Sequence, residues 1–113
     1  MTLALALLAA VAAAAVEVRL GEHGFDWTTV EEDRAHFRWS AEVINETSQA
    51  LEMTVTVDLL DDDDAVVHSD SVSTSVQPQS TQQVEHDGSL LFDRAADVVS
   101  FRFRLDPVTP TGR

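Results

Sequence analysis

The sequence predicts an all-β protein, a single antiparallel β-sandwich domain that follows a short apolar segment. Three stretches alternate apolar and polar residues with a period of two, which is typical of strands that bury one face. Short polar segments separate these stretches, as turns between antiparallel strands do. The chain has 113 residues, the length of one domain, and after residue 16 a helical pattern is limited to a turn near 92–96.

Residues 1–16 are uncharged and almost entirely apolar. The run is short for a membrane-spanning helix, which needs roughly 20 residues, and it has the length of a signal-peptide core, about 7–15 residues. Ala13 and Ala15 provide small residues for cleavage before Val16, although no Lys or Arg precedes the apolar core. We therefore expect a signal-like helix over 1–15 and an exported protein. An uncleaved anchor, a pilin-like stalk and a buried core helix are the alternatives.

The domain begins with two weak strand signals, at 16–20 and 25–30, which a glycine-containing break at 21–24 separates. In the second of these, Phe25 and Trp27 share one face of an expected edge strand. Packing of both side chains into the core is the favoured interpretation. An apolar edge that accepts a partner strand is the alternative.

Two strong strand signals follow, at 36–44 and 51–59. The polar segment 45–49 between them predicts a turn, in which Asn45 is expected to adopt the left-handed conformation. Its Asn-Glu-Thr sequence also spells a glycosylation sequon. The residues expected to point inward are Phe37, Trp39, Ala41 and Val43 in the first strand, and Leu51, Met53, Val55, Val57 and Leu59 in the second.

The rest of the chain contains two weaker strand signals and a third strong one, in which Phe101 and Phe103 point inward and Arg102 and Arg104 outward. Six or seven strands then form an immunoglobulin-like or fibronectin type III-like sandwich over 16–106. The expected elements are strands at 65–74, 81–86 and 99–105, breaks at 61–64, 77–80 and 87–89, a helical turn at 92–96, and a terminal coil at 107–113.

The charge balance excludes several classes of function. Twenty Asp and Glu oppose seven basic residues, all of them Arg, which gives a net charge of −13. Such a chain is repelled by phosphate, so we expect neither nucleic-acid binding nor attachment to anionic lipid. The absence of Cys removes disulfides, thiolate metal sites and cysteine nucleophiles. An acidic, Lys-free composition is typical of proteins from salt-rich environments, although an Arg-biased genome gives the same loss of Lys.

The middle of the chain resembles the FxLYD domain, a small bacterial and archaeal β-sandwich module. Val43 and Asn45 match its valine-x-asparagine element, and the Gln77-Pro78-Gln79 segment falls on its Pro-Gly step. Val57-Asp58-Leu59-Leu60-Asp61 lies on the signature, with Val in place of Phe and Leu in place of Tyr. The resemblance covers about residues 37–105. It implies a β-sandwich of extracytoplasmic proteins, without a shared catalytic site.

Four consecutive acidic residues, Asp61, Asp62, Asp63 and Asp64, form the most conspicuous polar cluster. Carboxylate oxygens are the ligands that Ca²⁺ prefers, so the cluster is a candidate calcium site at a hairpin tip. A loop site spaces its ligands at alternate positions and includes a Gly, and neither feature is present here. A solvated turn that uses the tolerance of Asp for left-handed backbone is the favoured interpretation.

No catalytic constellation is recognisable. We expect His36 and His68 at exposed strand positions, and His23 and His86 in loops or at strand ends. The serines of the strand at 65–74 and just beyond it alternate along a solvated face, and no G-x-S-x-G sequence is present. The sequence therefore predicts a non-enzymatic protein without a required cofactor.

The function expected from these observations is an exported or envelope-associated interaction module with protein partners at the cell envelope. The alternatives are a calcium-responsive surface domain that uses the four aspartates, and a membrane-anchored or pilin-like subunit that keeps its N-terminal segment. Contact with a membrane is expected only through that segment, if it is not cleaved. The partner and the oligomeric state are not encoded in any recognisable pattern.

Overall fold

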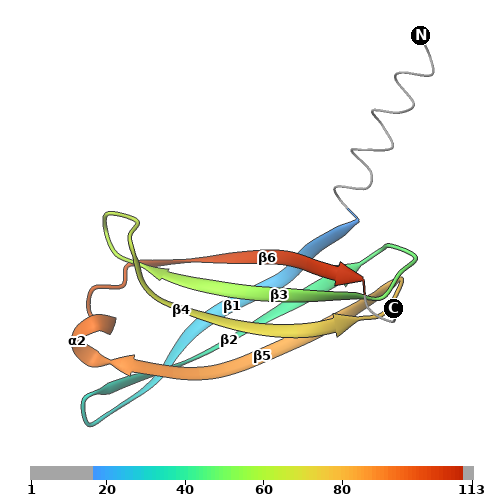
Figure 1. Cartoon of the computed structure of the whole chain (residues 1–113). Coiled ribbons are helices and arrows are strands. Elements are labelled where there is room, and N and C mark those ends of the chain that lie inside the picture. The colour runs from blue at the N-terminus through green and yellow to red at the C-terminus, as the bar shows by residue number, and fades with distance from the viewer. Residues whose placement is uncertain (1–16, 111–113) are drawn as a thin grey trace.

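A computed structural model describes residues 17–110, and the side chains of residues 17–106 (Figure 1). The predicted helix at 1–15 lies outside the described residues, as do residues 111–113 of the predicted coil. The prediction of coil is wrong for residues 107–110, because they continue the last strand and pair with residues 51–53. Within residues 17–110, no helix is long and apolar enough to cross a membrane.

The protein is an all-β sandwich of two three-stranded sheets, and every strand pair is antiparallel. The first sheet has the order β1-β2-β5 and the second the order β4-β3-β6, so β2 and β3 are the central strands. The short helix α2 connects β5 to β6. The elements are β1 (Val18–Glu31), β2 (Arg34–Asn45), β3 (Leu51–Leu60), β4 (Val66–Val76), β5 (Ser80–Leu91), α2 (Phe92–Ala95) and β6 (Ser100–Pro110).

The core lies between the two central strands, as the alternation predicts. Phe37, Trp39, Ala41 and Val43 of β2 are buried, and so are the four inward residues of β3 from Met53 to Leu59. Val76, Val84 and Leu90 complete this cluster. The period of two places these core side chains on one face of each strand. In β3 the opposite face is also partly covered, because Thr56, Asp58 and Leu60 are buried there.

The predicted breaks at 21–24 and 87–89 are wrong, because both segments lie within long strands. β1 continues through 21–24 with a shift of register between Leu20 and His23, so the glycines accompany a bulge and not a turn. In β5, Gly88 pairs with Phe37, and a Cβ at residue 88 would lie 2.5 Å from the tip of the Phe37 ring. Gly88 therefore makes room for a buried ring and does not end the strand.

The predicted turns at 45–49, 61–64 and 77–80 are confirmed, but Asn45 has another role than expected. The non-glycine residues with a left-handed backbone in the described chain are Glu32 in the β1–β2 turn, Asp64 in the β3–β4 turn and Gln79 in the β4–β5 turn. Asn45 is fully buried at the end of β2, where its amide donates to the carbonyls of residues 49, 76 and 77. It fastens two turns together at this end of the sandwich.

The last strand is less buried than its alternation predicts. Phe103 packs against the core, whereas Phe101 is 46% exposed. The cause is the position of β6 at the edge of its sheet, opposite the edge strand β1. Phe101 contacts Phe25 of β1 across this edge, with ring centroids 5.3 Å apart.

Candidate functional site

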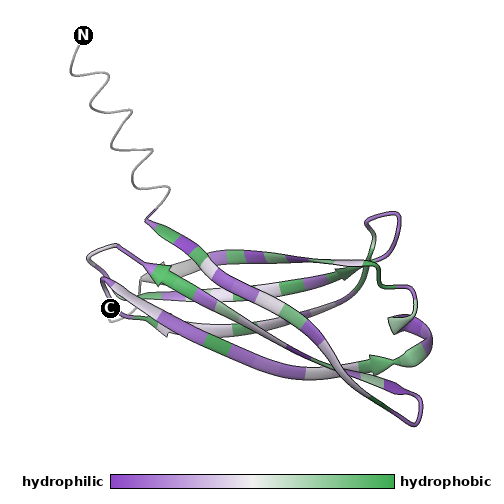
Figure 2. Ribbon diagram, turned by 180° about the vertical axis from the view of Figure 1, so that it is seen from behind, coloured by the Kyte–Doolittle hydropathy of each residue, from purple (hydrophilic) through white to green (hydrophobic). Residues whose placement is uncertain are grey.

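The large exposed apolar side chains of the described residues gather at one end of the sandwich, which we call the apolar end. It contains the β1–β2 turn, the β3–β4 turn and α2 (Figures 1 and 2). The opposite end contains Asn45 and the entry of the chain at Glu17. The exposed apolar residues are Trp27, Val30, Val66, Leu91, Phe92, Val99 and Phe101.

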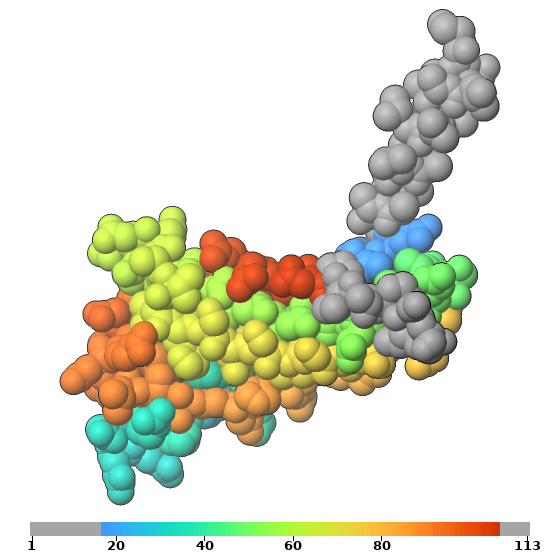
Figure 3. Space-filling view, in the orientation of Figure 1, coloured from blue at the N-terminus to red at the C-terminus, as the bar shows by residue number. Residues whose placement is uncertain are grey.

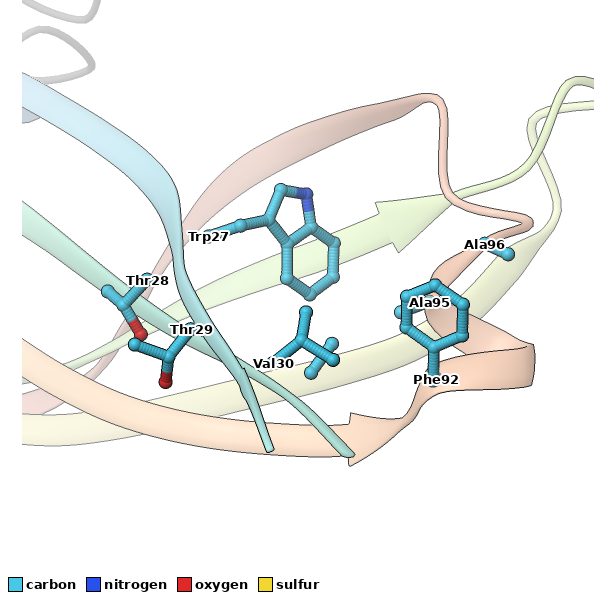
Figure 4. A pocket seen from close by; sticks show the side chains of 8 residues that line it. Trp27, Thr28, Thr29, Val30, Phe92, Ala95 and Ala96 are labelled. Carbon is cyan, nitrogen blue, oxygen red and sulfur yellow. The ribbon is translucent and has the colours of Figure 1, made fainter. Parts of the chain in front are cut away.

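A pocket of about 310 Å³ opens at the apolar end. Trp27 and Val30 approach it from β1, and Phe92 and Ala95 approach it from α2 (Figure 4). A hydrogen bond of 2.7 Å from the Phe92 N–H to the Asp33 carbonyl holds α2 against the β1–β2 turn. The walls are almost wholly hydrocarbon, so the pocket suits an apolar group.

Trp27 is 43% exposed, so the expectation that it packs into the core is wrong. β1 is confirmed as an edge strand, and its register with β2 shifts between Trp27 and Thr29. Phe25 does pack against the core, and the Trp27 ring meets it edge-on at 5.2 Å. The indole therefore rests on the core with one side and presents the other side to the pocket.

The apolar end is also strongly acidic. Its turns and helix, residues 31–34, 61–65 and 92–98, carry nine carboxylates and two arginines. Within the described residues, the one contact of these carboxylates with a basic side chain is that of Glu31 with His36, at 3.6 Å. We call this set the acidic rim: Glu31, Glu32, Asp33, Asp61, Asp62, Asp63, Asp64, Asp93 and Asp97.

The two arginines of the apolar end bind neutral groups. Arg34 donates to the Ser89 hydroxyl at 3.0 Å, and Arg94 donates to the Val67 carbonyl. The second bond ties α2 to β4, so α2 lies between the two sheets at this end. Figure 3 shows α2 and the turns gathered there on one surface.

The four predicted calcium ligands form a tight turn between β3 and β4. Asp61 accepts hydrogen bonds from the backbone N–H groups of Asp63 and Ala65, at 2.8 and 2.9 Å. Asp64 adopts a left-handed backbone, with φ of 63°. Carboxylate oxygens of Asp61, Asp62 and Asp63 lie within 4.8 Å of one another, and Asp64 is not part of this group. The geometry accounts for the turn, and calcium binding stays a prediction.

Asp58 is a charged group that the sequence patterns do not single out. It lies on the outward face of the central strand β3, yet it is only 1% exposed. Arg104 and Arg102 of β6 approach its carboxylate at 2.8 and 3.0 Å, and the Ser69 hydroxyl of β4 donates to it at 2.6 Å. The hydrogen bonds from Arg104, and then those from Ser69 and Arg102, hold the pKa of Asp58 far below its usual range despite burial.

The four histidines do not meet, and two of them are not where the sequence predicts. His23 and His86 lie inside β1 and β5 and not in loops or at strand ends, because these strands are longer than expected. The His86 Nδ1 atom lies 2.6 Å from Asp70, whose carboxylate also accepts the indole N–H of Trp39 at 2.7 Å. This contact joins β5 to β4 along one side of the sandwich.

The other two histidines are strand residues that are less open than expected. His36 is partly exposed in β2. The ring of His68 lies 6.0 Å from that of the buried Phe37, so His68 lies on the inward side of β4 and is only partly exposed.

The chain matches no protein-family model and no curated protein. Among solved structures, it is similar to part of a β-glucuronidase from glycoside hydrolase family 2, with a TM-score of 0.55 and 17% identity over 61% of this chain. It is also similar to part of a putative β-galactosidase from Bacteroides fragilis, with a TM-score of 0.52 and 19% identity over 61% of this chain. The matched parts are 7% and 10% of those chains. These likenesses support the β-sandwich fold alone.

Proposed function

We propose that the protein is a non-catalytic β-sandwich module, exported and acting at the cell envelope, whose apolar end binds a protein partner. The observation that carries this proposal is the concentration of exposed apolar side chains around a pocket at one end of the molecule. Contiguous apolar surface with a polar rim is typical of protein-interaction sites. A side chain of the partner could be buried in the pocket and lose its contact with water, as the central anchor residues of protein interfaces do.

The polar clusters support a structural interpretation of the rest of the molecule. Asp58 joins β3 to β6 and β4, and Asp70 joins β4 to β5. Asn45 fastens two turns. Each of these side chains forms its hydrogen bonds with neighbouring strands or turns. This favours a structural role for these groups over a catalytic one.

The strand order supports the finer fold class that the sequence predicts. The order β1-β2-β5 corresponds to strands A, B and E of immunoglobulin-type domains. The neighbours β3 and β6 correspond to strands C and F, and β4 takes the place beside C that variable-type domains fill with an additional strand. We infer an immunoglobulin-like or fibronectin type III-like sandwich. Its kinship with the FxLYD domain stays a prediction.

Site-directed photo-cross-linking in the cells that make the protein tests the interaction. A photoreactive residue at Phe92, in the pocket, is expected to capture an envelope protein. The same residue at Ser75, exposed on β4 near the opposite end, is the control and is expected to capture none. Equal capture from both positions, or protein found only in the cytosol without a captured partner, would contradict the proposal. The intact mass of the exported pool shows whether the chain begins near Val16 or keeps its N-terminal segment.

A second candidate function is a response to Ca²⁺, favoured by the three carboxylates that converge within 4.8 Å. Titration calorimetry at physiological salt is expected to show saturable binding that Asp62→Asn with Asp63→Asn abolishes. Asp64→Asn is the matched control, because Asn tolerates the left-handed backbone and Asp64 lies outside the cluster. The absence of saturable heat in the unmodified protein would remove this candidate.

A further inference from the structure

We propose that the pocket of the apolar end receives an apolar side chain of a cationic polypeptide segment. The inference rests on the proposed function and specifies the chemistry of the partner. Trp27, Val30 and Phe92 make the pocket a site for hydrocarbon. The acidic rim at the same end of the sandwich favours positive charge on the polypeptide that carries this apolar side chain.

The pocket has the construction of an anchor site. About 310 Å³ of space lies between an edge strand and a short helix, and aromatic rings line it from both sides (Figure 4). The Trp27 ring rests on Phe25 and also meets Phe37 edge-on, at 6.1 Å, so core aromatics support its position. A supported aromatic wall costs little ordering entropy when a ligand side chain packs against it.

The charges decide between possible occupants. Glu31 ends β1 next to the pocket residue Val30, and Glu32 and Asp33 form the β1–β2 turn. Asp93 and Asp97 flank the pocket residues at α2. The two arginines nearby bind neutral acceptors, so within the described residues none of these carboxylates is paired with an arginine. Positively charged groups beside the anchor would lower this repulsion and accelerate encounter.

The rest of the described sandwich is different, because its arginines between residues 17 and 106 are paired with carboxylates. Arg38 binds Asp87 at 2.7 Å, and Arg102 and Arg104 share Asp58. Carboxylates without an arginine partner also occur along the strands, among them Glu22, Glu52 and Glu85, but there they are spread out. At the apolar end nine carboxylates are gathered in three short segments, beside the exposed apolar surface. This coincidence argues against a second copy of the chain and against an anionic membrane as occupants, since both would bring like charge to the rim.

The test measures binding of the peptide acetyl-Lys-Lys-Ala-Phe-Ala-Lys-Lys-amide by chemical-shift changes of the backbone amides. We expect changes at residues 27–30 and 92–96. Replacing the peptide's Phe by Ala, or its Lys residues by Glu, is expected to weaken binding by about tenfold or more. Binding is also expected to weaken as NaCl rises, since the rim is exposed.

Two protein variants separate the pocket from the rim. Ala96→Trp fills the pocket from an exposed position and is expected to weaken binding about tenfold, whereas Ser75→Trp leaves it unchanged. Neutralising Glu32, Asp33 and Asp97 as amides is expected to weaken binding about threefold or more. The matched control neutralises three exposed carboxylates on the body of the sandwich, Glu22, Glu52 and Glu85, and is expected to have little effect.

Three outcomes would overturn this inference: binding of the acidic peptide as strongly as the cationic one, binding of phosphatidylcholine vesicles that Ala96→Trp abolishes, and a dimer that Ala96→Trp dissociates. Capture of an envelope protein at Phe92 together with failure of the cationic peptide would overturn the partner chemistry alone. Failure of both would overturn the proposed function as well.

Discussion

At the scale of single residues, Asp58 shows how a polar position on a strand becomes a structural centre. The alternation places it correctly on the outer face of β3, where a carboxylate is normally solvated. Arg102 and Arg104 extend over it from β6 and bury it. The sequence alone does not indicate this burial, because it depends on the register that sets Asp58 opposite Arg102.

Removal of the Asp58 carboxylate should destabilise the fold. Asp58→Ala leaves two guanidinium groups without their shared partner, and we expect a loss of about 3 kcal/mol, as for other broken buried ion pairs. Chemical denaturation provides the measurement. Asp106→Asn is the control, because Asp106 is an exposed partner of Arg104 and its removal should cost less than about 1 kcal/mol. Equal losses for both variants would show that Asp58 is not a centre of stability.

The same carboxylate should dominate the acid sensitivity of the fold. Its pKa is lowered from an ordinary value of 3.8, so the folded protein binds fewer protons than the unfolded chain below about pH 5. The stabilisation is present above the ordinary carboxyl range and is lost as pH falls through and below it. We expect the free energy of unfolding to fall less steeply between pH 5 and pH 2 in Asp58→Asn than in the unmodified protein. Parallel profiles would contradict this assignment.

At the scale of elements, the central strands are predictable and the long strands beside them are not. The sequences of β2 and β3 alternate apolar and polar residues, because each strand packs one face against the other sheet. In β1 and β5, glycines suggest breaks, since glycine is frequent in turns. Whether a glycine ends a strand or accommodates a neighbouring ring depends on the pairing partner, and Gly88 faces Phe37 only through the β2–β5 register.

Substitution of the strand glycines tests this distinction. Gly88→Ala places a methyl group against the buried Phe37 ring and should destabilise the protein by about 1–3 kcal/mol, as overpacking does. Gly24→Ala is the matched control, because a Cβ there meets nothing within 4 Å. It should be neutral or stabilise β1 by about 0.5 kcal/mol. Thermal or denaturant unfolding of the two variants gives the comparison, and a Gly88→Ala protein as stable as the unmodified one would refute it.

The candidate site is only partly readable from the sequence for the same reason. The acidic turn and the edge position of Trp27 follow from local patterns. The pocket does not, because it forms only when α2 packs against the β1–β2 turn through the bond from Phe92 to Asp33. These segments are far apart in sequence, and their contact follows from the strand order.

At the scale of the whole molecule, charge is distributed unevenly over a net value of −13. Most of the arginines outside the apolar end are paired with carboxylates, whereas the carboxylates of the acidic rim repel one another. Folding brings these carboxylates together and therefore works against a repulsion that the expanded chain avoids. Stability should depend on ionic strength as a property of the whole molecule.

Added salt should stabilise the protein. Screening lengths shorten from about 30 Å at 0.01 M to about 8 Å at 0.15 M salt, so the repulsion within the rim weakens. We expect the Tm to rise as NaCl increases, and the rise to be smaller in the variant with amides at residues 32, 33 and 97. The variant with amides at residues 22, 52 and 85 is the control for net charge. A Tm that falls with salt would mean that the paired arginines outweigh the rim.

The two ends of the sandwich also set a distance. The chain enters at Glu17, beside the turn that follows β2, and the pocket lies where β1 finishes. A 14-residue strand separates them, which corresponds to a span on the order of 40 Å. If another molecule held the amino end of the domain, the pocket would lie several screening lengths away from the surface charge of that molecule. The sandwich would then act as a rigid spacer. The encounter between the apolar end and a partner would depend on the electrostatic field of the acidic rim and not on that of the molecule holding the amino end.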